Sequence, residues 1–220
     1  LLGCYHETFK YLKTIGTYQL LKTQEKMEVN MVNRDQKNFL LRSGSLPYPL
    51  DLLQALTGFD HLSITQKLSA ILFIIKLRFL NPDKLMDRTV VEWLCSEGQT
   101  GELFSGIWDI LCTGAMNSSA EKASAGIFAH ILKVIFLGGK ENSRIVVPGT
   151  DLSSLFVENA VKYIEEMGGE VRFSEPLEAI EITAGKVTSV QTRVGRIERP
   201  DGLIMAMPAH AVKKVRGLEG

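Results

Sequence analysis

The sequence lacks an excess of charge of either sign, because its 220 residues carry 25 lysines and arginines against 25 aspartates and glutamates. Proteins that bind nucleic acid through its phosphates usually present an excess of positive charge, so this balance argues against that class. Cysteine is also scarce: Cys4, Cys95 and Cys112 are scattered and show neither CxxC nor Cys/His spacing. Their pattern fits neither a disulfide framework nor a zinc site, and it favours a reducing, cytosolic setting.

Long hydrophobic runs are missing as well. The longest, over residues 70–75, is extended only by a stretch to Leu80 that contains Lys76 and Arg78, well short of the roughly 20 apolar residues that cross a bilayer. The segment Leu68–Leu80 has two interpretations, a buried core helix or a helix that contacts a membrane interface. Because the chain opens without Met or a signal peptide, we expect it to be an internal segment of a longer protein.

Several motifs that carry chemistry are absent from the sequence: GxGxxG, a P-loop, a GxSxG elbow and HExxH. The four histidines, His6, His61, His130 and His210, are far apart, so structural roles are favoured over a metal site. With 45% hydrophobic and 23% charged residues, the composition is that of an ordinary globular protein of one large or two modest domains.

The first half of the sequence shows the periodicity of helices. Apolar residues spaced by three and four predict a helix over 4–15, whereas alternation predicts a hairpin over 26–42 with a polar break at 34–37. Further helices are predicted over 50–56, 66–80 (capped by Ser63), 90–96 (capped by Thr89) and 125–137, which is apolar almost all round. Ser118 and Glu121 have the spacing of a capping box for the last of these.

The second half changes to the periodicity of strands. A helix over 152–167 is followed by predicted strands at 171–173, 177–183, 187–194 and 203–207, the last apolar enough to be buried on both faces, with a tight turn at 184–186. We therefore expect an α+β protein: a mainly helical domain with a small hairpin over 1–147, then a helix and a short β-sheet over 148–220.

This order of elements resembles the internal part of the FAD domain in the flavin-dependent amine oxidase and phytoene desaturase superfamily. Short motifs in the first half are similar to those of hydroxysqualene dehydroxylases, also called squalene-associated FAD-dependent desaturases. The motifs are Leu2-Gly3-Cys4-Tyr5, the link Leu46–Leu50, Thr89–Leu94, Trp108 followed by Ala115-Met116-Asn117, and Ala123–Ala125.

The resemblance implies a flavin-dependent oxidoreductase acting on a squalene-type isoprenoid, held in an apolar tunnel while FAD supplies the redox chemistry. Family members also contain a GxGxxG turn and a second Gly-Asp segment that complete the flavin site, and this sequence has neither. We therefore expect FAD in the full-length parent and not in this chain alone. Alternatives that remain open are a carotenoid or phytoene desaturase, an amine oxidase, and a lipid-binding or interaction module without catalysis.

The resemblance also assigns cofactor contacts. It places Leu177 on the strand that meets the adenine edge of FAD, and Ala206 and Pro208 at a strand end beside the cofactor. Ordinary sheet packing is the alternative for all three.

For the substrate, the resemblance places Cys4 and Tyr5 near the flavin, and Trp108, Met116 and Asn117 on helices that line the lipid pocket. Core packing is the alternative for each of the five. No residue stands out as a catalytic acid or base.

Overall fold

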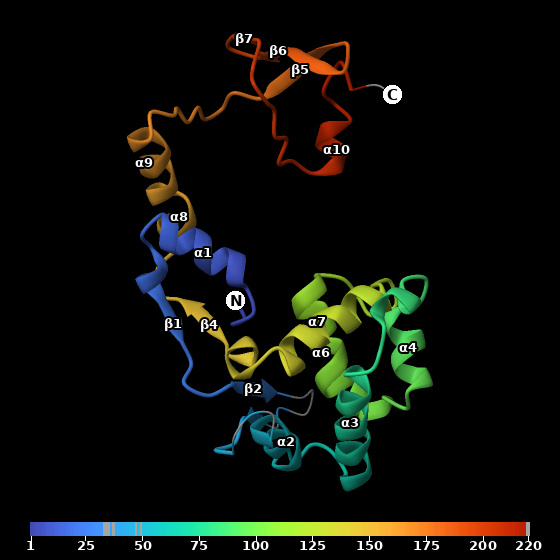
Figure 1. Cartoon of the computed structure of the whole chain (residues 1–220). Helices are drawn as coiled ribbons and strands as arrows, with labels where there is room; N and C mark the ends of the chain where they lie inside the picture. The colour runs from blue at the N-terminus through green and yellow to red at the C-terminus, as the bar shows by residue number, and fades with distance from the viewer. Residues whose placement is uncertain (33–35, 37, 47, 49, 219–220) are drawn as a thin grey trace. The chain divides into compact units, whose positions relative to one another are not determined.

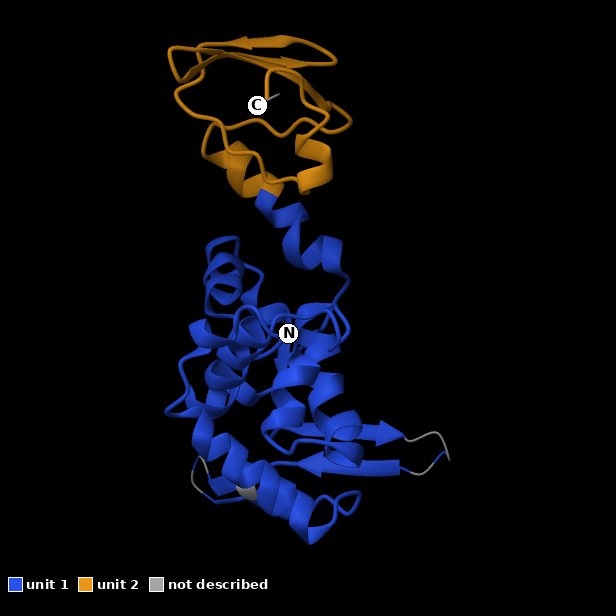
Figure 2. Cartoon of the chain, turned by 90° about the vertical axis from the view of Figure 1, so that its right-hand side faces the viewer, with its two compact units in different colours: residues 1–160 blue, residues 161–220 orange. Residues whose placement is uncertain are grey.

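The computed structural model describes residues 1–32, 36, 38–46, 48 and 50–218, which form two compact units, Leu1–Ala160 and Val161–Gly220 (Figures 1 and 2). Both units combine helices with small antiparallel sheets, which confirms the expected α+β class. The division of function between 1–147 and 148–220 stays a prediction. No helix in the described part of the chain has the length and hydropathy that crossing a membrane requires.

The first unit is mainly helical and contains two pairs of short strands. Its helices are α1 (His6–Thr14), α2 (Leu50–Thr57), α3 (Ile64–Leu77), α4 (Val90–Ser96), α5 (Gly101–Leu103), α6 (Asp109–Met116), α7 (Ala125–Leu137), α8 (Leu152–Phe156) and the start of α9 (Glu158–Glu166). Shorter turns are η1 (Tyr18–Leu20), η2 (Pro82–Leu85), η4 (Lys140–Ser143) and the π-helical η3 (Phe104–Trp108). The strands are β1 (Leu21–Thr23) paired with β4 (Val146–Pro148), and β2 (Glu28–Val32) paired with β3 (Asn38–Arg42).

Side-chain caps explain where two of these helices begin. The Ser63 hydroxyl accepts a hydrogen bond from the backbone N–H of Gln66, and the Gln66 side-chain oxygen accepts one from the backbone N–H of Ser63. Helix α3 therefore starts at Ile64 rather than at Gln66. Thr89 and Glu92 form the same reciprocal pair at the start of α4. Each box satisfies two amide groups that helix geometry leaves without an intrahelical partner.

The hairpin over 26–42 is confirmed by the pairing of β2 with β3 in the register Val29 to Leu41 and Met31 to Phe39. Alternation places these four residues on the half-buried face of the hairpin. Residues 34, 35 and 37 of the polar break and residues 47 and 49 of the link at 46–50 lie outside the described residues.

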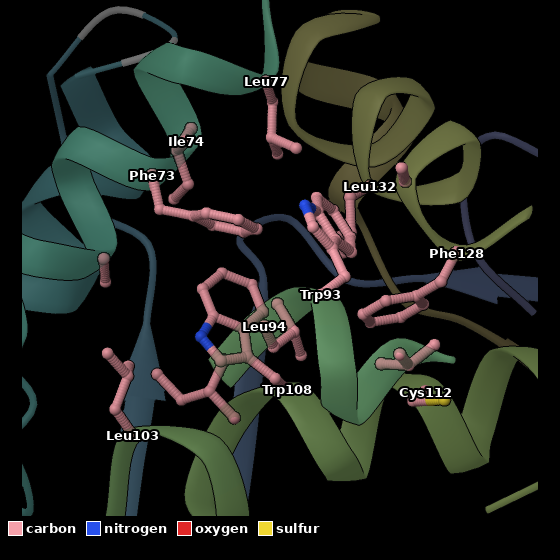
Figure 3. Packing of buried hydrophobic residues seen from close by; sticks show 14 of the residues in the cluster. Phe73, Ile74, Leu77, Trp93, Leu94, Leu103, Trp108, Cys112, Phe128 and Leu132 are labelled. Carbon is pink, nitrogen blue, oxygen red and sulfur yellow. The ribbon is translucent and has the colours of Figure 1, made fainter. Parts of the chain in front are cut away.

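The main apolar core joins α2, α3, α4, η3, α6 and α7. Figure 3 shows its aromatic centre, where the ring centroid of Phe73 lies 5.2 Å from those of both Trp93 and Trp108. Helix α7 packs here through Phe128 and neighbouring residues, but Ile127 on its other side is 48% exposed, so α7 is not buried all round as its composition suggested.

A second small core ties the start of the first unit to its end. Leu12 of α1 and Ile15, which directly follows α1, pack against Leu155 of α8. Strand β1 also pairs with β4, more than 120 residues away in the sequence. The β1–β4 pair is missing from the sequence-based prediction, because strands of three residues carry too little alternation to be recognised. The predicted helix over 152–167 is interrupted at Val157, which separates α8 from α9.

The capping box predicted at Ser118 and Glu121 is wrong. Helix α7 begins only at Ala125, after the N-cap residue Ser124. The intervening segment is held by α4 instead, because the Val90 and Val91 amides donate to the carbonyls of Ala123 and Ala120. These tertiary hydrogen bonds satisfy the first amides of α4 and keep residues 119–123 out of α7.

The second unit contains the three-stranded meander β5 (Leu177–Thr183), β6 (Lys186–Thr192) and β7 (Arg196–Glu198), followed by α10 (Ala209–Val212). The turn at 184–186 and the strands around it are confirmed. Ile180, Val190 and Val215 form the small core of this unit.

Two strands predicted for the second half are wrong. Residues 171–173 and 203–207 pair with no strand among the described residues, and a strand without a partner lacks the hydrogen bonds that define it. Leu203 and Met207 pack against the small core, whereas Ile204 is 94% exposed, so the second segment is not buried on both faces. Its composition reflects one-sided packing of an irregular chain.

Gly126 supports a close contact between α7 and η2, and we expect Gly126→Ala to destabilise the chain by about 1–2 kcal/mol. An added Cβ would lie 2.4 Å from the Met86 sulfur and 2.8 Å from the Pro82 carbonyl oxygen. Gly114→Ala in α6 is the matched control, because its Cβ would meet nothing within 4 Å. There the helix propensity of alanine should stabilise by about 0.5–1 kcal/mol. Urea unfolding of both variants measures the change in the free energy of unfolding. A change of the same sign in the two variants would contradict the prediction.

Candidate functional site

A cavity of about 140 Å³ lies in the first unit between the hairpin and the helices. It is comparable in size with an engineered apolar cavity of about 150 Å³ that binds benzene. Its walls come from segments far apart in sequence, from Leu2 at the start of the chain to Ile145. This makes it a product of the tertiary fold rather than of any local motif.

The hairpin and two helices form part of the wall. The half-buried face of the hairpin contributes Val29, Met31 and Leu41. Leu52 and Leu56 extend from one side of α2, because residues four apart lie on the same helical face. Ile74 approaches from α3.

The π-helical segment η3 supplies the part of the wall that includes Gly106, Ile107 and Trp108. A π-turn inserts one residue into a helix, and such turns occur frequently at functional sites. Ile110 and Leu111 of α6 continue the wall directly after it. No feature of the sequence indicated this irregularity.

Trp108 is fully buried and held in one orientation. Its indole Nε1 donates to Gln99 Oε1 over 3.0 Å, and Gln99 Nε2 donates to Ser69 Oγ over 2.9 Å. Phe73 and Phe136 pack edge-on against its ring (Phe73 in Figure 3). The polar atom of the indole is thus satisfied within the protein, and only the hydrocarbon part of Trp108 is left for the cavity.

Ser143 contributes the only hydroxyl among the described residues that line the cavity, and its Oγ donates to the Lys140 carbonyl over 3.2 Å. No carboxylate, imidazole or thiol is found among those lining residues. The described lining is therefore almost entirely apolar, and no acid or base lies in it to activate the one hydroxyl. Nowhere in the described ranges do three His, Cys, Asp or Glu side chains gather as a metal site would need.

Of the five residues predicted to contact substrate, Trp108 lines the cavity. Cys4 and Tyr5 precede α1 and are absent from the described lining; burial raises the pKa of the Cys4 thiol, and Tyr5 is 38% exposed. Met116 packs at the edge of the main core, and Asn117 ends α6 in a left-handed conformation that asparagine tolerates. The structure gives Met116 and Asn117 these packing and capping roles.

The three residues predicted to contact cofactor all lie in the second unit. Leu177 is half-buried against the Ile180 core, Ala206 is exposed in the irregular segment, and Pro208 precedes α10. The described residues contain no glycine-rich turn between a strand and a helix, where a dinucleotide pyrophosphate would be held. The residues present therefore do not form a complete flavin site.

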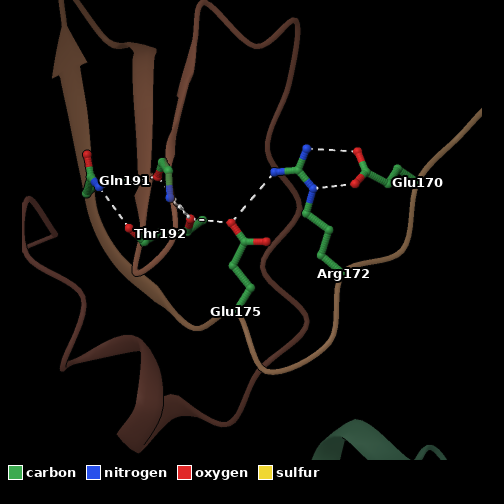
Figure 4. A network of polar contacts seen from close by, with 6 residues as sticks. Glu170, Arg172, Glu175, Gln191 and Thr192 are labelled. Carbon is green, nitrogen blue, oxygen red and sulfur yellow. Dashed lines mark hydrogen bonds and ion pairs between the residues drawn. The ribbon is translucent and has the colours of Figure 1, made fainter.

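A polar network secures the chain that leads into β5 (Figure 4). Arg172 forms two hydrogen bonds with Glu170, of 2.7 and 2.8 Å, and lies 3.7 Å from Glu175. Thr192 on β6 donates to the Glu175 carboxylate, whose side chain is 8% exposed. The bonds from Arg172 lower the pKa of Glu170. The network fixes the segment before Leu177 to the sheet.

Comparison with curated proteins finds relatives that carry one name. The hydroxysqualene dehydroxylase of Rhodopseudomonas palustris is 26% identical over 212 residues, covering 94% of this chain and 48% of the relative. That of Zymomonas mobilis is 23% identical over 225 residues, covering 98% of this chain and 50% of the relative. The chain thus spans about half the length of the curated relatives it matches.

Solved structures show the same fold at low identity. Putrescine oxidase bound to putrescine matches with a TM-score of 0.53 and 16% identity, over 88% of this chain and 43% of that one. A triple mutant of the same enzyme, redesigned in its cofactor binding, matches with a TM-score of 0.54. The model of the family described as flavin containing amine oxidoreductase matches residues 1–218, so the resemblance seen in the sequence is confirmed and the chain belongs to that family.

Proposed function

We propose that the first unit is the substrate-binding part of a flavin-dependent oxidoreductase and that its cavity holds part of a squalene-type isoprenoid. The observation that carries this proposal is the lining of the cavity, where every polar side-chain group among the described residues is already bonded within the protein. The names of the curated relatives support the same substrate class.

The energetics of an apolar ligand fit such a lining. A hydrocarbon offers no hydrogen bonds, so each unpaired polar group in its site would cost about 1–3 kcal/mol. Burial of apolar surface contributes about 25 cal/mol per Å², which favours a long hydrocarbon over a short one. At about 140 Å³ the cavity accommodates about one branched repeat of an isoprenoid, and the remainder of the ligand extends beyond it.

The flavin of this family supplies the redox chemistry. In this proposal the first unit binds the isoprenoid, orients it through the fixed ring of Trp108 and excludes water from the bound segment. Leu177, Ala206 and Pro208 are proposed to lie along the cofactor in the parent protein, together with segments that this chain does not contain.

Amine oxidation is the competing function, since the solved structures of similar fold include an enzyme that binds putrescine. A cationic amine needs a carboxylate or an aromatic cage. The described lining has no carboxylate, and the one aromatic pair, Trp108 and Phe136, meets edge-on. The cavity therefore favours the isoprenoid.

Displacement of a fluorescent long-chain probe tests the proposal, with squalene and putrescine as competitors. We expect squalene to displace the probe saturably and putrescine to have no effect. Ile110→Asp should weaken squalene binding by at least about tenfold, because it places a carboxylate in the lining. Ile127→Asp is the matched control: both isoleucines lie on helices and are 49% and 48% exposed, but Ile110 lines the cavity and Ile127 does not. Equal effects of the two variants, or displacement by putrescine, would contradict the proposal.

A further inference from the structure

Helix α3 exposes a continuous apolar stripe on the side opposite the core. It comprises Ile64, Leu68, Leu72 and Ile75 of α3 and Phe79 in the turn that follows the helix, which are 83%, 55%, 52%, 52% and 82% exposed. Steps of four, four and three residues align the first four along one face of the helix over about 16 Å, and Phe79 follows just after its end. The opposite face, with Phe73 and Leu77, is buried in the main core.

Cations border this stripe. The sequence of α3 contains no aspartate or glutamate. At about 100° per residue, Lys67 and Arg78 lie along one side of the stripe and Lys76 along the other. Lys76 Nζ lies 3.1 Å from Glu97 Oε2, and Lys67 Nζ donates to the Thr57 carbonyl over 2.8 Å. Within the described ranges no acidic group pairs with Lys67 or Arg78.

We propose that the stripe docks on the surface of a bilayer that contains anionic phospholipid. A helix that lies in a membrane interface carries an apolar face of large side chains with lysine and arginine beside it, as α3 does. The long lysine and arginine side chains reach the headgroups while the stripe enters the acyl boundary. A protein interface of this size normally includes hydrogen bonds, and no side chain of the stripe can form one.

Helix α3 also connects this surface with the cavity. Ile74 lines the cavity from the core side of the helix, and the next residue, Ile75, belongs to the stripe. A hydrocarbon dissolved in the bilayer would thus lie one helix away from its binding site. That consequence rests on the proposed function, whereas docking on the bilayer does not.

Sedimentation with vesicles tests the proposal, using the 220-residue chain and either phosphatidylcholine alone or phosphatidylcholine with phosphatidylglycerol. We expect binding to the mixed vesicles and weaker binding to the neutral ones. Ile75→Glu should reduce the partition coefficient by at least about tenfold. Ile127→Glu, at nearly the same exposure on α7, should leave it within about twofold.

A tryptophan reporter separates docking from loss of folding. Trp93 and Trp108 are at most 1% exposed, so Phe79→Trp adds an exposed indole whose emission should shift to the blue on addition of mixed vesicles. Ile127→Trp should show no shift. Circular dichroism establishes that each variant is folded.

The outcomes distinguish this proposal from the alternatives. Loss of vesicle binding in Ile75→Glu with squalene binding retained supports docking. Ile110→Asp, which should lose squalene binding, is expected to bind vesicles as the unaltered chain does. Failure to bind mixed vesicles overturns it. Analytical ultracentrifugation measures self-association of the chain. If the chain self-associates, Ile75→Glu abolishes this, and no vesicle binding is found, the proposal is overturned and a second copy of the chain is the occupant of the stripe.

Discussion

Replacement of Trp108 by alanine is expected to lower the free energy of unfolding by about 3–5 kcal/mol. The side chain is 0% exposed and packs against Phe73 and Phe136. Its removal joins a new void to the existing cavity and leaves the Gln99 side-chain oxygen without the indole donor. Both the lost packing and the unsatisfied polar group act in the same direction.

Urea unfolding followed by far-ultraviolet circular dichroism measures this loss. Phe79→Ala is the control, because Phe79 is 82% exposed and its removal should change stability by no more than about 0.5 kcal/mol. Trp108→Phe should fall between the two, since it keeps an aromatic ring and loses the hydrogen bond to Gln99. A loss below about 1 kcal/mol in Trp108→Ala would mean that the indole is not packed as described.

Gly3→Ala is expected to cost about 2–3 kcal/mol, an unusually large effect for a single added methyl group near a chain terminus. An added Cβ would lie 1.7 Å from the Glu141 carbonyl oxygen and 2.7 Å from its carbon, both backbone atoms. The Gly3 amide donates to the Arg144 carbonyl over 2.9 Å, so the segment has little freedom to move away. Alanine therefore has to separate two backbone segments.

The same substitution should weaken squalene binding, because Leu2 and Ile145 form a bridge at this point and both line the cavity. Tryptophan fluorescence during urea unfolding reports on the first unit, where both tryptophans lie. Gly114→Ala serves as the control, since it meets no neighbouring atom within 4 Å. A Gly3→Ala variant as stable as Gly114→Ala would show that the close approach to Glu141 is not required.

Local sequence signals predicted most helices of the first unit, the hairpin and the first two strands of the meander, but not the three-residue strand β7. They succeeded where the cause is local, as at the N-caps Ser63 and Thr89. The capping box predicted at Ser118 failed, because amides of α4 bind the carbonyls of Ala120 and Ala123. A sequence window cannot reveal such a partner.

The site was predicted less completely than the fold. Trp108 was identified through the family resemblance, and it lines the cavity. The contributions of Leu2, Val29 and Leu41 were missed, since a cavity assembled from distant segments leaves no motif. Conversely, the family motif that includes Gly3 has a physical reason in the approach of its backbone to Glu141.

The π-turn in η3 makes the helix over 101–116 respond differently to the loss and to the gain of one residue. Its inserted residue allows Leu103 and Trp108, five positions apart, both to be buried. On a regular α-helix, residues five positions apart would point about 140° away from each other. Deletion of one codon within 104–107 would leave the two residues four positions apart, about 40° from each other on a regular α-helix, so they would still share a face without the π-turn. Insertion of one codon would place them about 120° apart on a regular helix. Across evolution, this helix should therefore tolerate the loss of one residue here better than the gain of one.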